Sequence, residues 1–416
     1  MAHIGRLSAR PLGANFGLVS IIVAGATVMS VAMGIRQSFG LFLGPFTIET
    51  GVSYSYFAFT IALHNLVWGL AQPFAGAAAD RYGTTPVMVG GGIIFSAGLA
   101  MTAAFHSQLG TLIGLGVLVG LGLSATTFGV VLSSVGRAVS VSRRTSIMGL
   151  TSAFGSIGQA VLVPVAQYAI DRSGAATSML WLGLIMLAAS PLGLVFLTAE
   201  RKAQDATTAA LSGSNISVRE ALYEACTHRG YALLTLGFFT CGFQLAFINT
   251  HLPGYVTTCH LPATVGAAAL TVFALSNAVG SWVCGALGAR YRPQFVLAWI
   301  YVLRTAAIAA LLLLPKTGFV VIAFAAFTGF IALGTVPLTS GLISRIFGVQ
   351  NLGLLFGVCF LSHQVGSFFG AWLGSVVFSA TGSYDSVWIF TGVAGLFAAL
   401  LHVPIKDSAV PRLARA

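Results

Sequence analysis

Several side chains that can carry positive charge lie inside long apolar runs of the sequence, and two of them are the best candidates for chemistry. Arg36 lies in the run MSVAMGIRQSFGLFLGPF, which begins at Met29, and His363 lies in FLSHQVG, which begins at Phe360. An arginine at the centre of a bilayer costs about 2.5–3.5 kcal/mol on insertion scales. Snorkelling, a neighbouring acceptor or an anionic ligand must offset that cost, and we favour the ligand for Arg36. His363 could bind a carboxylate when charged and release it when neutral, because histidine titrates between pH 5 and 8.

Amide side chains in similar runs could supply hydrogen bonds to a substrate carboxylate or hydroxyl. Four of them are expected to bind substrate together with the two cations: Gln159, Gln244, Asn249 and Gln364. Ser and Thr are weaker indicators, because they often bond the preceding turn of their own helix. His64 and His251 also lie in apolar runs, where a neutral histidine can equally be a helix-packing donor.

All nine acidic residues fall at the ends of the apolar runs or between them. They are Glu49, Asp80, Asp171, Glu200, Asp205, Glu220, Glu224, Asp385 and Asp407. A carrier of organic cations usually needs a buried carboxylate to replace the hydration of the cation. This chain offers buried cations instead, so the sequence predicts an anionic substrate and lacks the usual acidic proton relay.

The rest of the chain has the composition of a polytopic membrane protein. Of its 416 residues 57% are hydrophobic and 7% charged, with a mean hydropathy of +0.93, which excludes a normal soluble globular protein. A span needs about 20 apolar residues, and Gly, Pro and charged clusters divide the chain into twelve expected transmembrane helices. These are expected to begin near Phe16, Tyr54, Thr85, Leu109, Ser146, Ser178, Tyr231, Ala263, Phe295, Gly318, Leu352 and Val387.

The net charge of +11 could indicate nucleic-acid binding, but the placement of the charges excludes it. Most Lys and Arg residues fall on one side of the membrane, and only Arg172 and Lys316 fall on the other. This positive-inside bias predicts an inner (cell) membrane protein with both termini in the cytoplasm. Ser217-Val-Arg-Glu220 has capping-box spacing and predicts a short cytoplasmic helix. The five cysteines show no CxxC spacing and are expected to be packing residues.

The two halves of the chain repeat each other. Gly76-x-x-x-Asp80-Arg81-Tyr82-Gly83 follows the second expected span, and Gly285-x-x-x-Ala289-Arg290-Tyr291-Arg292 follows the eighth. Arg137 and Arg345 likewise close the fourth and tenth spans. A parallel repeat of this kind predicts a substrate site between two bundles near the midplane. We expect an N-terminal six-helix bundle over residues 1–199, a cytoplasmic linker over 200–229 and a C-terminal six-helix bundle over 230–416.

The stretch from Gly76 to Gly83 resembles the G-x-x-x-D-R-x-G-R-R loop that the major facilitator superfamily carries between its second and third helices. The chain departs from the loop at Thr84 and Thr85, where basic residues are usual, and at Ala289, where the second copy lacks its acid. The resemblance covers nearly the whole chain and implies an all-α membrane protein with twelve transmembrane helices in two pseudo-symmetric bundles. It also implies a conformational latch, formed by Gly76, Asp80, Arg81 and Gly83. A carboxylate there could accept bonds from a neighbouring helix N-terminus and hold one state closed.

Within the superfamily the chain looks most like the monocarboxylate and oxalate–formate carriers. The monocarboxylate branch keeps a cation in the first helix, where Arg36 falls, and the oxalate branch keeps a lysine in the eleventh, where His363 falls. The chain departs from both branches at Ser281, where they carry an arginine, and from the monocarboxylate branch at Asn277, where it carries an aspartate. The resemblance also places Arg304 in a peripheral helix, where it is expected to bridge main-chain carbonyls.

Together these features predict a secondary active transporter of small organic anions, above all monocarboxylates, that works as a monomer by alternating access. Arg36 and His363 would bind the carboxylate from opposite halves, and any proton coupling would run through His363 or the protonated substrate. The main alternative is an efflux carrier of amphiphilic drugs, suggested by the 30 phenylalanines, and a non-transporting membrane sensor is a more distant one. No ATP-binding motif, metal cluster or catalytic triad is apparent in the sequence, so neither an enzyme nor a cofactor is expected.

Overall fold

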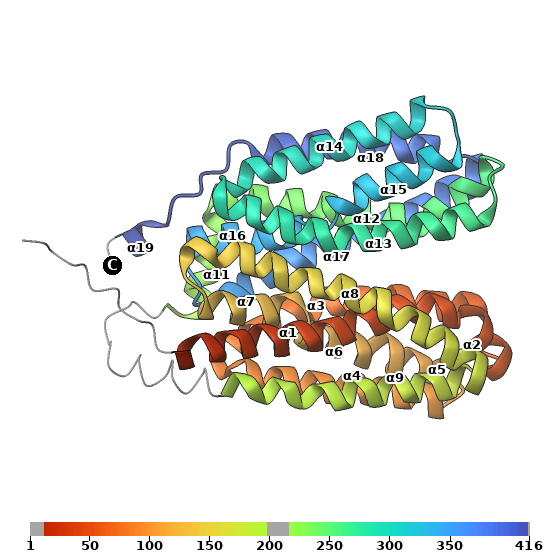
Figure 1. The fold of residues 1–416 in the computed structure, drawn as a ribbon, viewed down its shortest axis with the longest axis horizontal. Coiled ribbons are helices and arrows are strands. Elements are labelled where there is room, and N and C mark those ends of the chain that lie inside the picture. The colour runs from red at the N-terminus through yellow and green to blue at the C-terminus, as the bar shows by residue number, and fades with distance from the viewer. Residues whose placement is uncertain (1–11, 198–215, 415–416) are drawn as a thin grey trace, which may run out of the picture.

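Two bundles of long helices lie side by side in the computed structural model, which describes residues 12–197 and 216–414 (Figure 1). The described residues contain no strand. Arg6, Arg10, Arg415 and the part of the predicted linker before residue 216 lie outside the described residues. The division at residues 199 and 230 therefore stays a prediction.

The N-terminal bundle contains the six expected spans, several of them divided into shorter elements. Its elements are α1 (Leu12–Ser38), η1 (Phe39–Phe42), α2 (Leu43–Thr50), α3 (Tyr54–Tyr82), α4 (Thr84–Ala104), α5 (Gln108–Thr111), η2 (Leu112–Leu118), α6 (Val119–Thr126), α7 (Phe128–Ala138), α8 (Val141–Ser173), α9 (Ala175–Ala189) and η3 (Ser190–Leu194). The first span is α1, the second α3, and the fourth runs from α5 to α7.

The C-terminal bundle follows a short connecting helix. The elements are α11 (Val218–Thr227), α12 (Arg229–Thr258), α13 (Ala263–Arg290), α14 (Pro293–Leu313), α15 (Gly318–Phe330), α16 (Thr335–Phe347), α17 (Leu352–Thr381), α18 (Asp385–His402) and α19 (Pro411–Ala414). The predicted capping box at α11 is confirmed, because Glu220 N–H donates to Ser217 Oγ and Ser217 N–H donates to the Glu220 carboxylate.

Eleven stretches of the described helices are long and apolar enough to cross a membrane. The helix α3, with 29 residues, occupies the position of the second expected span, and at 1.5 Å per residue it is about 44 Å long, enough to cross a bilayer core. The helices begin within a few residues of their predicted starts. The twelve-helix architecture is thus confirmed.

Two of the spans are interrupted, which the hydropathy pattern did not predict. The fourth span breaks at Thr127, whose backbone is extended (φ −122°, ψ −154°) between α6 and α7. The tenth breaks over residues 331–334, between α15 and α16. Side chains must satisfy the backbone groups freed at such breaks inside the bilayer.

Charged residues at the ends of other helices satisfy backbone groups in the same way. The Glu49 carboxylate accepts from the N–H groups of Ala175 (2.5 Å) and Ala176 (3.3 Å) at the start of α9. Lys316 Nζ donates to the carbonyls of Leu311 and Leu312 at the end of α14. Opposite charges at opposite helix ends match the helix dipole, so these residues have structural roles.

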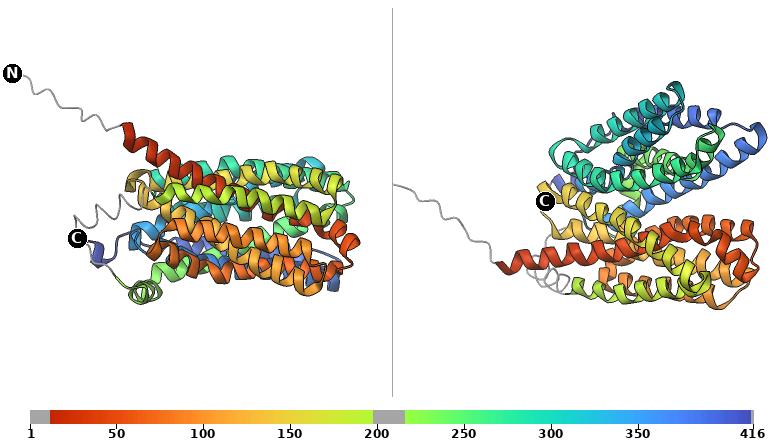
Figure 2. Two further views of the ribbon diagram at one scale, coloured as in Figure 1. Left: turned by 90° about the horizontal axis from the view of Figure 1, so that it is seen from below. Right: turned by 45° about the vertical axis from the view of Figure 1, so that its right-hand side comes forward.

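The two bundles lie closer together at one end of the molecule than at the other (Figure 2). We call it the arginine-rich end, because the helix ends on that side carry Arg81, Arg137, Arg144, Arg290 and Arg345. There α3 crosses α17 at Gly76, where a Cβ atom would lie 2.1 Å from the carbonyl oxygen of Gly353. Helices α8 and α13 meet at Gly149 and Gly285, where each added Cβ would lie 2.7 Å from the Cα of the other glycine. Only glycine permits this backbone approach, so the two halves are closed together at this end.

Candidate functional site

Arg36 lies near the end of α1 and is half-buried. Its Nε and Nη2 groups donate to Oδ1 of Asn65 on α3, at 3.2 Å and 2.8 Å. The guanidinium carbon lies 5.2 Å from the centroid of the Trp68 ring, which gives the cation an aromatic neighbour. Among the described residues no carboxylate pairs with Arg36, so its charge is held by a neutral amide and an indole.

The contacts of Arg36 leave part of its hydrogen-bonding capacity unused. A guanidinium has five N–H donors, and the Asn65 oxygen bridges the Nε and Nη2 edge. No described residue accepts from the edge formed by Nη1 and Nη2. Two parallel N–H groups on such an edge match the two oxygens of one carboxylate.

Asn65 connects Arg36 to the other half of the molecule. Its side-chain Nδ2 donates to the Ile61 carbonyl at 3.0 Å, which orients the amide so that Oδ1 faces Arg36. Its main-chain carbonyl accepts from Nε2 of Gln364 on α17 at 3.1 Å. The Gln364 Oε1 atom lies 3.2 Å from Nδ1 of His363. Arg36, Asn65, Gln364 and His363 thus form one chain of hydrogen bonds across the interface.

His363 is 8% exposed and lies among aromatic rings. Its ring stacks on Phe360, with centroids 5.4 Å apart and planes 6° apart, and lies 4.8 Å from the Phe238 ring. The Nδ1 atom can donate to Gln364 Oε1, which leaves Nε2 as the second hydrogen-bonding atom of the ring. This Nε2 atom is buried and has no nitrogen or oxygen partner among the described residues, while the Cys241 thiol is a neighbour of the ring.

The three other predicted substrate residues do not join this chain of hydrogen bonds. Gln159 on α8 is half-buried and Asn249 on α12 is exposed. The buried amide of Gln244 donates from Nε2 to the Thr391 carbonyl (3.0 Å) and accepts at Oε1 from Nη1 of Arg304 (3.4 Å). Both ends of the Gln244 amide therefore bond structural partners, and its contact with substrate stays a prediction.

Arg304 is 1% exposed and bridges main-chain carbonyls, as its expected role requires. Its Nη2 donates to the carbonyls of Ile331 (2.8 Å) and Ala332, and its Nη1 donates to Sγ of Cys241 (3.4 Å). These carbonyls belong to the break after α15, where intrahelical partners are missing. The cation satisfies the carbonyl end of a helix, which explains a buried arginine with no acid.

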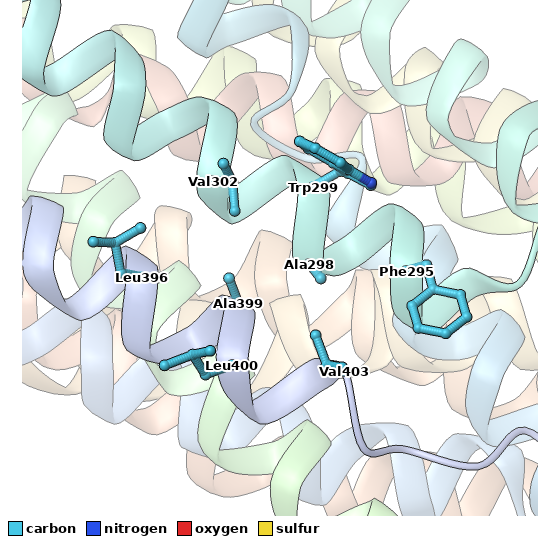
Figure 3. Close-up of a pocket in the computed structure, with 8 residues that line it drawn as sticks. All are labelled: Phe295, Ala298, Trp299, Val302, Leu396, Ala399, Leu400 and Val403. Atoms are coloured by element: carbon cyan, nitrogen blue, oxygen red, sulfur yellow. The ribbon is translucent and has the colours of Figure 1, made fainter.

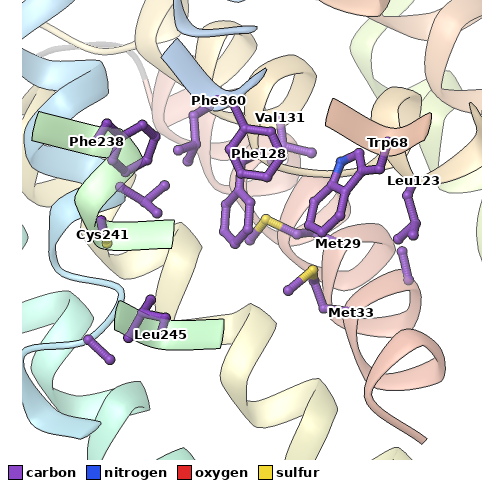
Figure 4. Packing of buried hydrophobic residues seen from close by; sticks show 14 of the residues in the cluster. Met29, Met33, Trp68, Leu123, Phe128, Val131, Phe238, Cys241, Leu245 and Phe360 are labelled. Carbon is purple, nitrogen blue, oxygen red and sulfur yellow. The ribbon is translucent and has the colours of Figure 1, made fainter. Parts of the chain in front are cut away.

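An aromatic cluster fills the interface beside Arg36 (Figure 4). Trp68 on α3 lies 4.8 Å from Phe360 on α17 and 6.5 Å from Phe128 on α7, measured between ring centroids. All three side chains are 2% exposed. The cluster joins rings from both halves, so in this state it closes the interface with apolar contacts.

The predicted latch residues lie at the arginine-rich end. The Asp80 carboxylate pairs with Nη1 of Arg137 at 2.5 Å and accepts from the N–H of Leu354 at the start of α17, at 2.9 Å. Gly83 links α3 and α4 with φ +93°. Arg81 is exposed and lies over the Tyr82 ring, 5.2 Å from its centroid, away from the carboxylate.

The partner of Asp80 is Arg137, which the loop motif did not identify. Its position at the close of the fourth span was the available signal, because the end of α7 lies beside the end of α3. Asp80 thus pairs with Arg137, and Gly76 and Asp80 make the contacts with α17, while the latch role of the predicted residues stays a prediction.

A groove of about 500 Å³ lies between α14 and α18, and none of the predicted site residues lines it (Figure 3). Its lining is formed by apolar side chains: Phe295, Ala298, Trp299, Val302, Leu396, Ala399, Leu400 and Val403. It offers no cation or amide to a carboxylate. The groove is therefore not a candidate for the anion site.

Comparison with known proteins places the chain in a family. A sequence model of the Major Facilitator Superfamily matches residues 17–320 and 234–415. The uncharacterized MFS-type transporter YcxA of Bacillus subtilis is 24% identical over 399 residues, covering 91% of this chain and 93% of YcxA. Human monocarboxylate transporter 11 is 24% identical over 418 residues, covering 95% of this chain and 85% of the human protein.

Solved structures agree on the fold. A variant of the Escherichia coli fucose:proton symporter FucP superimposes with a TM-score of 0.70 at 14% identity, covering 93% of this chain and 98% of FucP. The family match covers more than half of the chain, and the fold is that of a transporter rather than an enzyme. The chain belongs to the Major Facilitator Superfamily.

Proposed function

We propose that this transporter carries small organic anions, above all monocarboxylates, by alternating access between its two bundles. The observation that carries the proposal is the half-buried Arg36, whose charge has an amide partner and no acid, and whose Nη1 and Nη2 edge has no acceptor among the described residues. A cation in the bilayer needs compensation. A substrate carboxylate on that edge supplies it.

His363 is the proton-coupling candidate from the opposite half. A histidine that carries a proton is a cation, which favours an anion nearby. The resemblance to the monocarboxylate and oxalate–formate carriers, and the similarity to human monocarboxylate transporter 11, support the same substrate class. Both termini are proposed to face the cytoplasm, so the arginine-rich end is the cytoplasmic end and the described state is closed there.

The test is uptake of a labelled panel of short monocarboxylates into proteoliposomes, with and without an inward proton gradient. Wild type should take up at least one acid, and Arg36→Ala should abolish that uptake. Arg36→Lys keeps the charge without the two-pronged edge and should retain only part of it. Arg172→Ala is the matched control, because Arg172 is an exposed arginine that lies over the Tyr168 ring, and it should transport like wild type.

Uptake that survives in Arg36→Ala would refute the assignment of the site. Wild-type protein that folds but takes up no acid would refute the substrate class. The alternative of an amphiphilic-drug efflux carrier would then come first, because the aromatic cluster of Trp68, Phe128 and Phe360 could bind apolar compounds.

A further inference from the structure

Asn65 is the point at which the candidate anion site and the contact between the two halves meet. We propose that Asn65 is a specificity-determining positioning residue: its neutral amide fixes Arg36 without consuming its charge and ties the occupied edge to α17. The proposal rests on the proposed function, because it assigns a task within the same site.

The orientation of the Asn65 amide determines which of its atoms faces Arg36. Nδ2 donates to the Ile61 carbonyl, four residues earlier in α3, so Oδ1 is the atom left for Arg36. Both bonds from Arg36 converge on this one oxygen, at 3.2 Å and 2.8 Å. The guanidinium is thereby held on its Nε side, and its Nη1 and Nη2 edge keeps a fixed direction. Positioning of this kind lowers the cost of binding a ligand.

The Asn65 side chain carries no charge. An aspartate has nearly the same shape and could accept the same two bonds, yet it would neutralise Arg36 from within the chain. A carboxylate fixed beside the guanidinium competes at a high effective concentration with any carboxylate from solution. The choice of amide over acid at residue 65 therefore determines whether the site attracts an anion.

Asn65 also links Arg36 to the C-terminal half of the molecule. The Asn65 carbonyl receives Nε2 of Gln364, and a carbonyl oxygen can accept two bonds. Gln364 reaches this carbonyl because residue 69 is glycine, since a Cβ on Gly69 would lie 2.6 Å from Cβ of Gln364 and 2.9 Å from its Cγ. Gln364 is thus a tie between the halves, and its expected direct contact with substrate is replaced by this role.

The tie also has a conformational consequence. Opening the arginine-rich end requires α3 and α17 to separate, which breaks the bond from Gln364 to Asn65. An anion on Arg36 and the interface bond therefore act on the same residue from two sides. Loss of the tie should change the balance of states without removing the anion site.

The experiment measures equilibrium binding of one monocarboxylate, the best substrate of the wild type, to purified Asn65→Ala and Asn65→Asp between pH 4 and 8. Loss of the oxygen that accepts both Arg36 hydrogen bonds should weaken binding by about tenfold in Asn65→Ala. Asn65→Asp, although closer in shape, should weaken it by about a hundredfold or more at pH 7. Protonating the introduced carboxyl at the acidic end of the range should restore much of the loss.

The pH profile separates this role from a merely structural one. Near the amide the titratable groups are Arg36 on α1, His64 on α3 and His363 on α17, while α4, α5, α6 and η2, which also pack on α3, carry none. The charged residues of the remaining neighbours α2 and α7 are Glu49 and Arg137, which bond Ala175 and Asp80. The wild-type and Asn65→Ala profiles contain the contributions of those groups, so the acid-dependent recovery should appear in Asn65→Asp alone.

The outcomes distinguish this inference from the proposed function. Wild type that binds no anion refutes the proposed function. Wild type that binds while Asn65→Asp binds as well as Asn65→Ala, or better, at pH 7 refutes the role of the amide. If Asn65→Ala does not fold, Asn65→Ser supplies a neutral acceptor for the same comparison. Gly69→Ala should leave anion affinity within about threefold of wild type while shifting the halves apart, and a larger loss of affinity would contradict the separation of the two tasks.

Discussion

Removal of the Asp80 charge should open the arginine-rich end of the molecule. Asn at this position keeps an oxygen that can accept from the Leu354 N–H but loses the ion pair with Arg137. A hydrogen bond to a charged group contributes about 1.5–3 kcal/mol. The Arg137 side chain is 30% exposed and that of Asp80 is 4% exposed, so solvent screening reduces the loss to about 1–2 kcal/mol. A change of this size shifts the ratio of closed to open molecules by about 5- to 30-fold.

Distances between spin labels can measure that shift by double electron–electron resonance. Tyr82→Cys and Tyr291→Cys place one label on each half at the arginine-rich end, where both side chains are exposed. The five native cysteines must first be replaced, because Cys226 is exposed. Asp80→Asn and Arg137→Ala should both add a population at longer distance.

Asp171→Asn is the matched control, because it removes an acid whose partner is Gln167 of the same helix, so the distance distribution should not change. An unchanged distribution in Asp80→Asn would refute the latch. A shift in Asp171→Asn of the same size would show that the effect is not local.

Three further predictions follow from individual contacts. Arg304→Ala removes the arginine donor from the Ile331 and Ala332 carbonyls, of which Ala332 keeps the longer bond from Thr335 Oγ1 (3.4 Å). The variant should lower the stability of the protein by about 2 kcal/mol, seen as a lower thermal midpoint in detergent, whereas Arg172→Ala should leave it unchanged. Gly76→Leu should favour the open state in the spin-label assay, because even a Cβ at this position overlaps the Gly353 carbonyl; a closed distribution would contradict the close crossing. Partial burial pushes the pKa of Asp407 up, but the hydrogen bonds from Arg292, its charge and other nearby donors together outweigh burial and leave this pKa lowered. The stability that Asp407 contributes is therefore complete above its ordinary pKa and lost as pH falls below it, so hydrogen exchange over residues 403–414 should accelerate at low pH in wild type but not in Asp407→Asn.

The number of helices and the residues at which they begin and end could be predicted from the sequence. An apolar run must be long enough to cross the bilayer, and its ends are marked by charge, Gly or Pro. It also marked Arg36 as unusual, since a charged residue within such a run needs a reason. The identity of its partner could not be read in the same way. Asn65 lies on another helix, and which residues face each other depends on helix rotation and crossing, which the hydropathy pattern does not specify.

The same limit applies to the partners of Gln244. A buried amide indicates that a partner exists, yet substrate and helix backbone satisfy an amide equally well. The break between α15 and α16 frees carbonyls that accept hydrogen bonds from Arg304, and Arg304 in turn donates to Gln244. The helix break could not be predicted from the amino-acid sequence, so the contacts of Arg304 and Gln244 that depend on it could not be predicted either.

The missing acid of the second loop shows how the repeat departs from symmetry. Arg345 closes the tenth span as Arg137 closes the fourth, but the acid position is Ala289. Arg345 donates instead to the Gly288 carbonyl (2.7 Å) and lies 3.7 Å from Asp407, which belongs to the segment after α18. A carboxylate from outside the repeat thus takes part of the place of the missing one.

This substitution has a mechanical consequence. Asp80 reaches across the halves to the Leu354 N–H, whereas Asp407 pairs with Arg345 and Arg292 within the C-terminal half. The contact of α3 with α17 therefore includes a hydrogen bond from the Leu354 N–H to a carboxylate, and this bond must break on opening. The contact of α8 with α13 relies instead on the close approach at Gly149 and Gly285. Asp407→Asn should consequently leave the spin-label distances closed while Asp80→Asn opens them. Equal opening by the two variants would show that the ends of both repeats act as latches.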